Sequence, residues 1–591
     1  MLNFRMLERR TILRSMLPAL LIIGIGLIIY SNTFYSPFYF DDEYYIVKNP
    51  VIKDLSYFWG PSKAKDFENI FGYHTLVMRY IGDLTFALNY ELHGLDVSGY
   101  HAANIAIHLI NALLAYLLTS LVLKTPRTGN SSEYERLLLP LAAALIFVSH
   151  PVQTESVTYI TQRFTSLAAM FYLLSFIGYA KFRLTEKKIW YAAAITSAIL
   201  GMKTKEIVFT LPPMLTLFEF MFFEGDAKKR IKHLLPILLT LIIIPASLFV
   251  ISKHADIAAI LNDATRAKSD MPRSDYLFTQ FRVVITYLRL LMLPVNQNLD
   301  YNYPVYTSFL NPDVFLSFIA IAALIGTASI LPLKTNDRHL RIASFGLLWF
   351  FAALSVESSM IPTQDMIFEH RTYLPSFGFI VSAVSLLFFM KDKFCLRNSY
   401  VAAFLAIVTI VLCILTYQRN DIWADELTLW EDTAKKTTDK ARVYNNLGFA
   451  CNKKGQPDRA IVLYRTALSL KPDYAEAYNN LGYSYYTKKM FSEAIEQYEK
   501  AISLMPSFAE AYNNLGAVYG DKNKTDIALE YFKTAARLNP GFISARYNAA
   551  LAYFRMGMRQ EAMKETSELL KIMPGNKQAQ ELYAKIVSSS P

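Results

Sequence analysis

The chain has 591 residues, and 53% of them are apolar. This length exceeds that of one ordinary domain, and a mean hydropathy of +0.23 is high for a soluble protein. The net charge of +11 does not indicate nucleic-acid binding, because Arg and Lys concentrate in short loops between apolar runs. The three cysteines show neither metal-ligand spacing nor a disulfide framework.

Apolar runs fill residues 15 to 417, and several approach the roughly 20 residues that a membrane-spanning helix needs. Basic residues within 1–14 precede the first run, and no small-residue cleavage site follows it. We therefore expect an uncleaved anchor with a cytoplasmic N-terminus. The loop charges then predict about eleven crossings. The expected spans are about 15–31, 102–123, 138–152, 164–180, 189–202, 207–223, 234–251, 313–332, 343–357, 373–390 and 399–417.

The apolar run 278–294 is interpreted as an interfacial or re-entrant segment. Counted as a crossing, it would move the basic clusters at 334–341 and 391–397 to the outer side. Without it, several polar loops share the outer side with the C-terminal region. These are the loops around Asp41, His150, Lys203 and Glu369, and the segment 252–312. The sequence thus predicts a multi-pass protein of the bacterial inner membrane or an equivalent membrane.

After residue 418 the chain becomes amphipathic and carries a repeat of 34 residues. The residues in register are Pro472, Pro506, Pro540 and Pro574, and Ala460, Ala494, Ala528 and Ala562. This is the tetratricopeptide pattern, in which helix pairs stack because one pair cannot bury its apolar face alone. We therefore predict an all-α protein. Its parts are a membrane helix bundle at 15–418, a linker and half-repeat cap at 419–440, four repeats at 441–574 and a capping helix at 575–591.

One asparagine occupies the same position in all four repeats: Asn446, Asn480, Asn514 and Asn548. Asparagine is not favoured inside a helix, so the recurrence needs a reason. Its amide carries both a donor and an acceptor and can hold an extended peptide whatever its sequence. One interpretation is a groove for an acceptor peptide, and the alternative is bonding within the stack.

Asp41 and Asp42 follow the first apolar run, between aromatic residues. A lone carboxylate there would be explained by interfacial solvation, but ionisable groups near a membrane are costly and often functional. A carboxylate in this place can accept a proton from an attacking hydroxyl. We interpret the pair as the catalytic carboxylates and leave open which of them takes the proton.

Cations on the predicted outer side would complement an anionic sugar donor, since arginine can fork onto a phosphate. The candidates are Arg79, Arg163, Lys203, Lys205 and Arg371. Each can equally be a pairing residue or an interfacial anchor. His150 is as consistent with a packed helix end as with a site residue. No cluster has convincing metal spacing, and the residues do not require a cofactor, although they leave room for a divalent metal.

Several motifs, taken in order, resemble one family. They are Phe40-Asp41-Asp42, His150-Pro151-Val152-Gln153-Thr154-Glu155, Lys205-Glu206, Glu369-His370-Arg371-Thr372-Tyr373-Leu374-Pro375-Ser376 and Arg419-Asn420-Asp421-Ile422-Trp423. With the C-terminal repeats they are similar to the transmembrane and tetratricopeptide-repeat (TMTC) proteins, which belong with the GT-C glycosyltransferases. The resemblance covers nearly the whole chain.

The resemblance implies a membrane protein O-mannosyltransferase that uses a polyprenyl- or dolichyl-phosphate sugar donor. It implies Asp41 as the catalytic carboxylate and Asp42 as its partner or substitute. Glu155, Glu206, Glu369 and His370 are implied as supporting residues, with Arg163 and Arg371 at the donor phosphate. The expected partners are this lipid, the bilayer and an acceptor protein bound by the repeats, whose Ser or Thr hydroxyls receive the sugar.

Two other functions compete with this prediction. A membrane-anchored scaffold would use the repeats to gather proteins without catalysis, but about eleven crossings are excessive for an anchor. A transporter or flippase would need carboxylates near the middle of its spans. Here the predicted spans contain few charged residues, and the charges lie at their outer ends.

Overall fold

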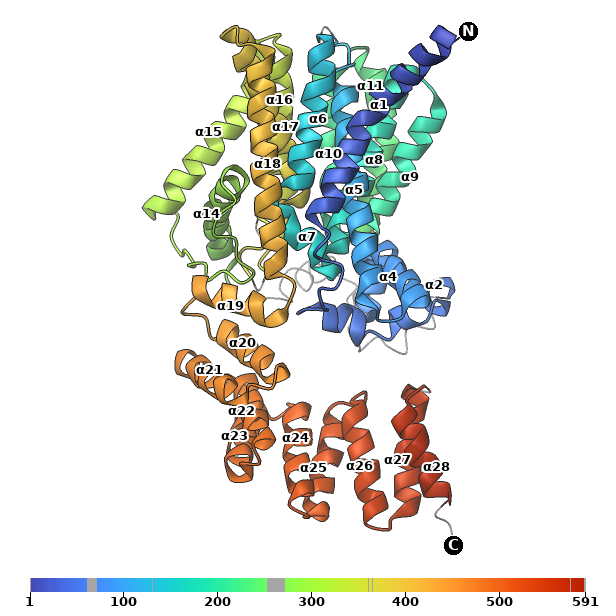
Figure 1. Ribbon diagram of the computed structural model, residues 1–591, viewed down its shortest axis with the longest axis vertical. Coiled ribbons are helices and arrows are strands. Elements are labelled where there is room, and N and C mark those ends of the chain that lie inside the picture. Colours follow the sequence, from blue (N-terminus) through green and yellow to red (C-terminus); the bar gives the residue numbers. More distant parts are fainter. Residues whose placement is uncertain are drawn as a thin grey trace. The chain divides into compact units, whose positions relative to one another are not determined.

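The computed structural model describes residues 2–60, 72–129, 131–251, 271–359, 361–363, 365–573 and 575–588. Within these ranges the ordered elements are helices and no strand occurs, in agreement with the predicted all-α class. The chain divides into two units, Met1–Asp425 and Glu426–Pro591 (Figure 1). The boundary between them in the sequence falls within the predicted linker 419–440. Pro574 and residues 252–270 of the predicted outer segment lie outside the described residues.

The first unit contains long apolar helices joined by short helical turns. Its elements are α1 (Leu2–Ile29), η1 (Glu43–Val47), η2 (Val51–Lys53), α2 (Ser56–Trp59), α3 (Gly72–Met78), α4 (Tyr80–His93), α5 (Val97–Val122), α6 (Glu133–Ser149), η4 (Pro151–Gln153), α7 (Thr154–Thr158), η5 (Ile160–Gln162), α8 (Arg163–Thr185), α9 (Lys188–Met202), η6 (Glu206–Thr210), α10 (Leu211–Phe222), α11 (Ala227–Leu238), η7 (Leu239–Ile242), α12 (Ile243–Ile251), α14 (Arg273–Met292), α15 (Pro312–Lys334), α16 (Arg338–Leu354), η8 (Glu369–Thr372), α17 (Tyr373–Lys393) and α18 (Asn398–Ile422).

Six helical stretches of the described chain are long and apolar enough to cross a membrane, or seven if a pair bent by 51° between Ser149 and Pro151 counts as one span. Two apolar helices, Met16–Ile29 and Lys188–Met202, are shorter. The predicted spans at 207–223 and 343–357 correspond to α10, with 12 residues, and α16, with 17. The multi-pass character is supported, and the count of about eleven stays a prediction.

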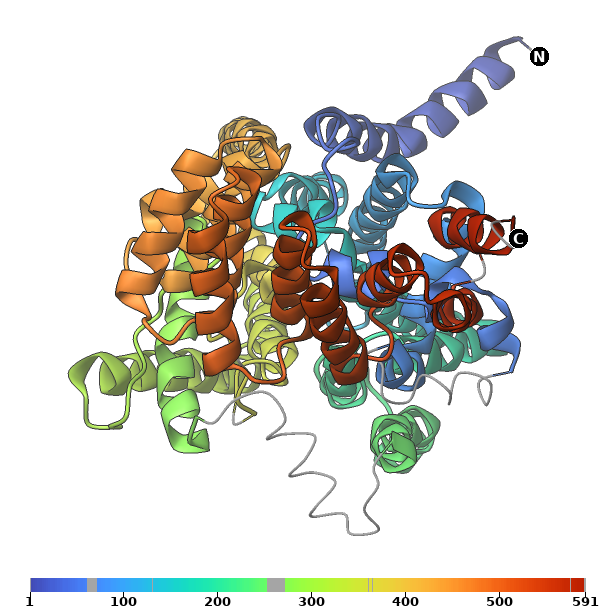
Figure 2. The same ribbon diagram turned by 90° about the horizontal axis from the view of Figure 1, so that it is seen from below.

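The interfacial segment predicted at 278–294 corresponds to α14, which is not among the candidate spans. Figure 1 shows α14 nearly end-on, whereas α16, α17 and α18 run along the vertical of the view; Figure 2, turned by 90°, shows α14 lengthwise. It therefore runs across the bundle and is paired with α15 and with the segment around Phe368.

Close backbone contact fixes the start of α17, which follows the polar turn η8. Gly346 of α16 and Gly378 of α17 face each other so closely that a Cβ on either would lie 2.4 Å from the carbonyl oxygen of the other. Any larger residue would push the two helices apart. The contact thus fixes the register of α17 against α16, and with it the position of η8.

The second unit is a stack of helix pairs. Its helices are α19 (Glu426–Lys436), α20 (Ala441–Lys453), α21 (Pro457–Leu470), α22 (Ala475–Thr487), α23 (Phe491–Leu504), α24 (Ala509–Asp521), α25 (Thr525–Leu538), α26 (Ile543–Arg555), α27 (Arg559–Ile572) and α28 (Lys577–Ser588). In the first three repeats a glycine lies against an aromatic ring of its partner helix, at Gly448, Gly482 and Gly516; a Cβ there would approach the ring to 2.7–2.8 Å. The glycine that recurs every 34 residues at these three positions is thus a packing requirement.

Candidate active site

The Asp41–Asp42 pair lies in a tight turn after α1. Phe40 adopts a φ of 48°, a left-handed conformation that is rare for a bulky residue and costs about 1–3 kcal/mol. The turn is closed twice. The backbone N–H of Asp42 donates to the Tyr39 carbonyl at 2.8 Å, and the N–H of Tyr39 donates to Asp42 Oδ2 at 3.0 Å. The surrounding contacts therefore hold a strained backbone at the two carboxylates.

The two carboxylates lie in different environments. Asp42 is fully buried, and its Oδ1 accepts bonds from the N–H of Thr161, at 2.8 Å, and from the Thr161 hydroxyl. Burial raises the pKa of Asp42 to about 7, although these donors act in the opposite direction. Asp41 is only half-buried, and its backbone N–H donates to the Tyr159 hydroxyl at 2.9 Å. Asp42 is thus built into the loop, and Asp41 is the member of the pair with exposed surface.

Aromatic residues tie this turn to distant parts of the first unit. The Tyr39 hydroxyl donates to the Trp423 carbonyl at 2.5 Å, and the two rings meet edge to face. Burial, followed by the charges of Asp41, Asp42 and Glu155, raises the pKa of Tyr159 well above its ordinary value. Tyr159 therefore lies within electrostatic range of all three carboxylates.

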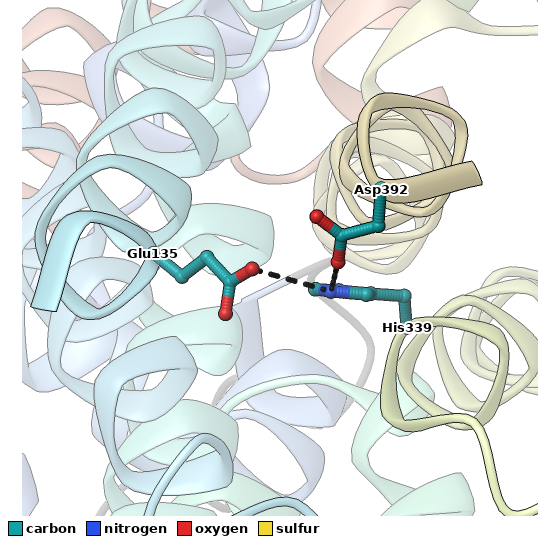
Figure 3. Close-up of side chains that lie close together, drawn as sticks. All are labelled: Glu135, His339 and Asp392. Carbon is teal, nitrogen blue, oxygen red and sulfur yellow. Dashed lines mark hydrogen bonds and ion pairs between the residues drawn. The ribbon is translucent and has the colours of Figure 1, made fainter. Parts of the chain in front are cut away.

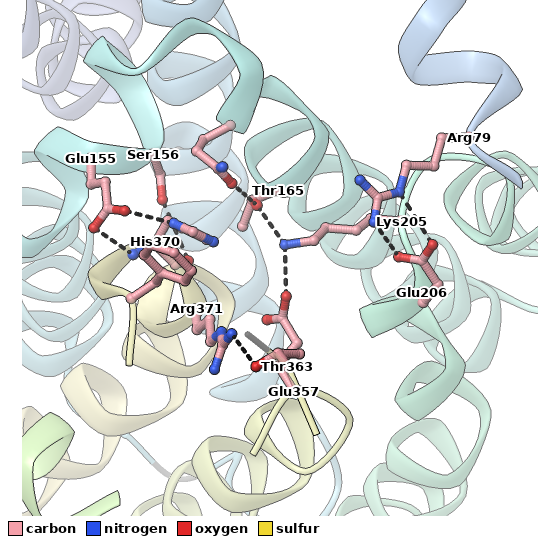
Figure 4. Close-up of polar contacts among 12 residues, drawn as sticks. Arg79, Glu155, Ser156, Thr165, Lys205, Glu206, Glu357, Thr363, His370 and Arg371 are labelled. Carbon is pink, nitrogen blue, oxygen red and sulfur yellow. Dashed lines mark hydrogen bonds and ion pairs between the residues drawn. The ribbon is translucent and has the colours of Figure 1, made fainter. Parts of the chain in front are cut away.

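A network of charged residues joins the loops around Arg79, Lys205 and His370 (Figure 4). Arg79 makes a two-pronged ion pair with Glu206, at 3.2 and 3.0 Å. Burial alone would raise the pKa of Glu206, but Arg79 holds it at about 2. The buried Lys205 Nζ lies 2.8 Å from Glu357 Oε1 and 2.9 Å from Thr165 Oγ1. These pairs bring three separate loops together.

His370 is oriented by Glu155. Nδ1 of the imidazole lies 2.7 Å from Glu155 Oε1, and the His370 backbone N–H donates to Oε2 at 3.2 Å. A carboxylate at Nδ1 places the proton on that nitrogen and leaves Nε2 as an acceptor when the ring is neutral. The predicted supporting residues Glu155 and His370 thus form a buried dyad beside Lys205 (Figure 4).

Arg371 holds the loop that precedes η8. Its guanidinium donates to the Thr363 hydroxyl at 3.0 Å and to the carbonyls of Asp365 and Met366, both at 3.2 Å. Only 5% of the residue is exposed. Arg371 therefore contributes positive charge to the network while its N–H groups shape the loop.

Arg163 has a scaffolding position. It is 1% exposed, and its N–H groups donate to the side-chain oxygens of Asn104 and Asn89, at 2.6 and 2.5 Å, and to the carbonyls of Thr85 and Tyr100. The ring of Phe86 lies under the guanidinium, 4.4 Å from centroid to Cζ. Arg163 thus ties α8 to α4 and α5, and its predicted contact with a donor phosphate stays a prediction.

Three other predicted residues also have structural partners. His150 Nδ1 accepts from the N–H of Val152, and Nε2 lies 3.1 Å from the Leu291 carbonyl, so the ring joins η4 to the end of α14. The buried Glu369 accepts three bonds, from Asn298 N–H, Tyr301 hydroxyl and Gln297 amide, at 2.6–2.7 Å. Lys203 Nζ lies 2.6 Å from Ser247 Oγ of α12.

Sequence reasoning missed Glu357 as a site residue. It lies three residues beyond α16, in a stretch without a recognisable motif, and contacts Lys205. Its one available signal was a carboxylate at the outer end of the predicted span 343–357. Thr161 and Tyr159, which hold Asp42 and Asp41, were also missed, since nothing in the sequence shows that 159–161 folds back onto the first loop.

A second polar cluster joins α6, α16 and α17 (Figure 3). Nε2 of the buried His339 lies 3.2 Å from Asp392 and 3.6 Å from Glu135. These three residues have metal-ligand chemistry and spacing. However, Arg338 lies 2.7 Å from Glu135, and Lys391 lies 2.9 Å from Asp392. Two cations already balance the two carboxylates, so we interpret the cluster as an ion-pair network that joins three helix ends.

This interpretation predicts that metal removal does not destabilise the protein. EDTA should leave the thermal unfolding temperature of the purified chain unchanged. Glu135→Gln should lower it by about 2 °C, because Arg338 and Lys391 lose their buried partner. Differential scanning calorimetry with and without EDTA measures both effects. A drop with EDTA that is reversed by added divalent cation would instead establish a metal site.

The asparagines of the repeats bond from one repeat to the next. The side-chain amides of Asn480, Asn514 and Asn548 donate to Asn445, Asn479 and Asn513 of the preceding repeat, at 2.9–3.0 Å. The alternative use within the stack is therefore observed for three of the four. Asn446 accepts from its neighbour Asn445 at 3.3 Å. Their part in a peptide groove stays a prediction.

Asn480→Ala should loosen the contact between the first two repeats. It removes a half-buried bond worth about 1 kcal/mol, so amide hydrogens of α20 to α23 should exchange several-fold faster in the full chain. Asn446→Ala is the matched control, because it has the same chemistry and leaves the bond from Asn480 to Asn445 intact. Equal exchange rates in both variants would contradict the claim that the bond from Asn480 to Asn445 stabilises the contact between the two repeats.

The comparisons with known proteins agree with the sequence motifs. Tetratricopeptide-repeat models match residues 448–489, 487–523 and 509–542. Over 472 residues the chain is 26% identical to protein O-mannosyl-transferase F38B6.6 of Caenorhabditis elegans, covering 77% of this chain and 62% of that protein. Over 517 residues it is 24% identical to protein O-mannosyl-transferase TMTC3 of Mus musculus, covering 76% and 51%.

Among solved structures, the crystal structure of MamA matches 27% of this chain and 89% of its own, with 29% identity and a TM-score of 0.23. The chain spans between about half and two thirds of the length of the two curated relatives. The predicted resemblance is confirmed: the curated relatives of this chain are protein O-mannosyl-transferases, several of them named as TMTC proteins, and its C-terminal region consists of tetratricopeptide repeats.

Proposed function

We propose that this chain is a TMTC-type membrane glycosyltransferase. It transfers a hexose, mannose in the first instance, from a polyprenyl-phosphate donor to Ser or Thr hydroxyls of exported proteins. The observation that carries the proposal is the half-buried carboxylate of Asp41 in a strained turn. Tyr45 lies within electrostatic range of Asp41, Arg79 and Glu206, and Tyr159 lies within range of Asp41 and Glu155. The names of the curated relatives, protein O-mannosyl-transferases, support the same reaction.

Asp41 is the proton acceptor in this proposal, because a general base must come within hydrogen-bond reach of the hydroxyl. Asp42 has no exposed surface, and both of its oxygens already accept bonds from the chain. It therefore positions the turn. Tyr159 supports Asp41 from the other side through the backbone N–H. This assigns separate roles to the two adjacent carboxylates.

The reaction is a single displacement. The acceptor hydroxyl gives its proton to Asp41, and its oxygen forms a bond to the anomeric carbon of the sugar. The bond from that carbon to the phosphate oxygen breaks, and polyprenyl phosphate leaves with the electron pair. Attack opposite to the leaving group inverts the anomeric centre. Positive charge placed where the phosphate gains charge lowers the barrier.

Lys205 is the cation that we assign to the donor phosphate. An ammonium group has three hydrogens, and the described contacts of Lys205 Nζ involve Thr165 and Glu357. Arg371 adds a second positive charge nearby, as the electrostatics of Glu357 show. No metal is assigned a step in this proposal. Acceptor proteins are assigned to the tetratricopeptide repeats, because stacked repeats of this kind form an extended concave binding surface.

The membrane arrangement belongs to the same proposal. We assign a cytoplasmic N-terminus and extracytoplasmic repeats, with about eleven crossings in a bacterial inner membrane or an equivalent membrane. Short apolar helices such as Lys188–Met202 and α16 are counted as crossings in this scheme. Accessibility labelling of single cysteines introduced in the repeats tests the orientation, and labelling only from the cytoplasmic side would contradict it.

The donor class is tested with purified full-length protein and a panel of labelled donors. Polyprenyl-phosphate mannose, polyprenyl-phosphate glucose and a nucleotide sugar are offered with a Ser/Thr-rich peptide. The proposal expects transfer from a lipid donor and none from the nucleotide sugar. Absence of transfer from every donor, combined with tight binding of exported proteins, would favour a membrane-anchored scaffold.

A further inference from the structure

Glu357 lies inside the cluster of cations that we assign to the donor phosphate. Its Oε1 is 2.8 Å from Lys205 Nζ, and 18% of its side chain remains exposed. Lys205 itself is 6% exposed. An ion pair this buried is costly to desolvate and weak as a source of stability, so its presence needs a further reason. The exposed edge of Glu357 means that a ligand that reaches Lys205 also meets this carboxylate.

Surrounding residues fix the backbone of Glu357. Its N–H donates to the Leu354 carbonyl at the end of α16, and its carbonyl accepts from the Tyr276 hydroxyl of α14 at 3.0 Å. Burial favours the neutral acid, but Lys205 first, followed by Arg371 and His370, holds the pKa of Glu357 below its ordinary value. The carboxylate is therefore ionised at neutral pH and faces two permanent cations.

The other charges around it are partly balanced. Arg79 is neutralised by the bidentate contact with Glu206. Burial lowers the pKa of His370 well below its ordinary value, so the ring is neutral, and burial raises the pKa of its partner Glu155 to about 7. Lys205, Arg371 and Glu357 together carry one net positive charge, to which a partly ionised Glu155 adds negative charge. Tyr276 of α14 donates its hydroxyl to the Glu357 carbonyl. Burial raises the pKa of Tyr287, also on α14, so this neighbour adds no charge at neutral pH.

The two lipids of the proposed reaction differ by nearly one charge. The sugar donor is a phosphodiester with a single negative charge. The released polyprenyl phosphate is a monoester, which carries about −1.5 to −2 at pH 7 because its second pKa is about 6. The Glu357 carboxylate repels both lipids, and because the Coulomb energy scales with the charge of the ligand, it repels the doubly charged product about twice as strongly as the donor.

We infer that Glu357 is a specificity residue that makes the phosphate site select the singly charged donor and release the doubly charged product. The inference rests on the proposed function. Glu357 takes no proton and forms no bond to the sugar. Its effect is electrostatic and is exerted through the field at Lys205. It should therefore change the ratio of product affinity to donor affinity more than it changes the chemical step.

The test measures binding and does not depend on turnover. Full-length wild type and Glu357→Gln are titrated in nanodiscs with polyprenyl phosphate and with its methyl diester, a sugar-free lipid with one charge. Glutamine has the size of glutamate and can still accept from Lys205. At pH 7.5 the variant should bind the monoester at least about tenfold more tightly than wild type does, and the diester only about threefold more tightly, because the lost repulsion scales with the charge of the lipid. At pH 5, where the monoester carries one charge, this difference between the two lipids should disappear.

Two further variants keep the result interpretable. Glu357→Asp retains the charge, and its ratio of monoester to diester affinity should equal that of wild type. Glu224→Gln removes an exposed carboxylate beyond α10, paired with Arg127 at 3.7 Å, and should change neither lipid. If Glu357→Gln fails to fold, Glu357→Ala is titrated in its place, and the ratio of monoester to diester affinity must then exceed that of wild type at pH 7.5 and equal it at pH 5.

The outcomes distinguish a failure of the proposed donor class from a failure of the role inferred for Glu357. Binding of neither lipid to wild type would count against the proposed donor class. Binding of both lipids with the same ratio in wild type and Glu357→Gln, at both pH values, would overturn the inference and leave the proposed function standing. A ratio that shifts equally at pH 7.5 and pH 5 would also overturn it, because the shift would then not follow the charge of the phosphate.

Discussion

Asp41→Asn should reduce the rate of sugar transfer by about 10³-fold, because a positioned general base contributes about 10² to 10⁴. The amide keeps the size of the side chain, and the bond between the Asp41 backbone N–H and Tyr159 does not involve the side chain. The variant should therefore fold and bind the lipid donor as wild type does. Single-turnover transfer of labelled sugar measures the rate, and thermal unfolding checks the fold.

Asp42→Asn is the matched neighbour of that experiment. Both oxygens of Asp42 accept backbone bonds, and an amide can replace one oxygen only. We expect a lower unfolding temperature together with a smaller loss of rate per folded molecule. If instead Asp42→Asn loses the larger rate with an intact fold, the two roles are exchanged and Asp42 is the base.

Arg163→Met should destabilise the first unit by several kcal/mol, because each buried acceptor left without a donor costs about 1–3 kcal/mol. Two asparagine oxygens and two backbone carbonyls would lose their donor inside the protein. Arg163→Lys keeps the charge but lacks the planar guanidinium with its several N–H donors, so we expect it to recover only part of the lost stability. Thermal unfolding in detergent measures the stability of each purified protein, and we expect it to fall from wild type to Arg163→Lys to Arg163→Met.

This experiment also separates two roles of Arg163. A residue that holds α4 and α5 onto α8 lowers stability when it is replaced, and the molecules that stay folded keep their donor affinity. A residue that contacts the donor phosphate raises the apparent KM for the donor and leaves the unfolding temperature nearly unchanged. An unchanged unfolding temperature for Arg163→Met would contradict the scaffolding role derived from its contacts.

The repeats were the part of the fold that the sequence predicted most directly. A period of 34 residues fixes the helix pairs, their order and the packing role of Gly448 and its equivalents. The membrane unit was predicted less completely. Hydropathy locates apolar stretches but does not show where one helix breaks, as at the bend between Ser149 and Pro151, or that α14 runs across the bundle.

The candidate site was predicted by residue type and less well by role. The carboxylates Asp41 and Asp42 and the Lys205–Glu206 and His370–Arg371 motifs were identified from order and chemistry. Which cation is already bonded to neighbouring carbonyls, as Arg163 is, depends on contacts between residues more than 50 apart in sequence. The pairing of Lys205 with Glu357 has the same origin, and one sequence carries no record of it.

The most direct test of the central claim is site-localised mass spectrometry of a Ser/Thr peptide after incubation with the purified chain and polyprenyl-phosphate mannose. The account predicts one added hexose on a Ser or Thr hydroxyl with wild-type protein, and no such product above background with Asp41→Asn. A hexose that appears equally with both proteins, or none with wild type despite bound lipid donor, would contradict the claim that this site transfers sugar through Asp41.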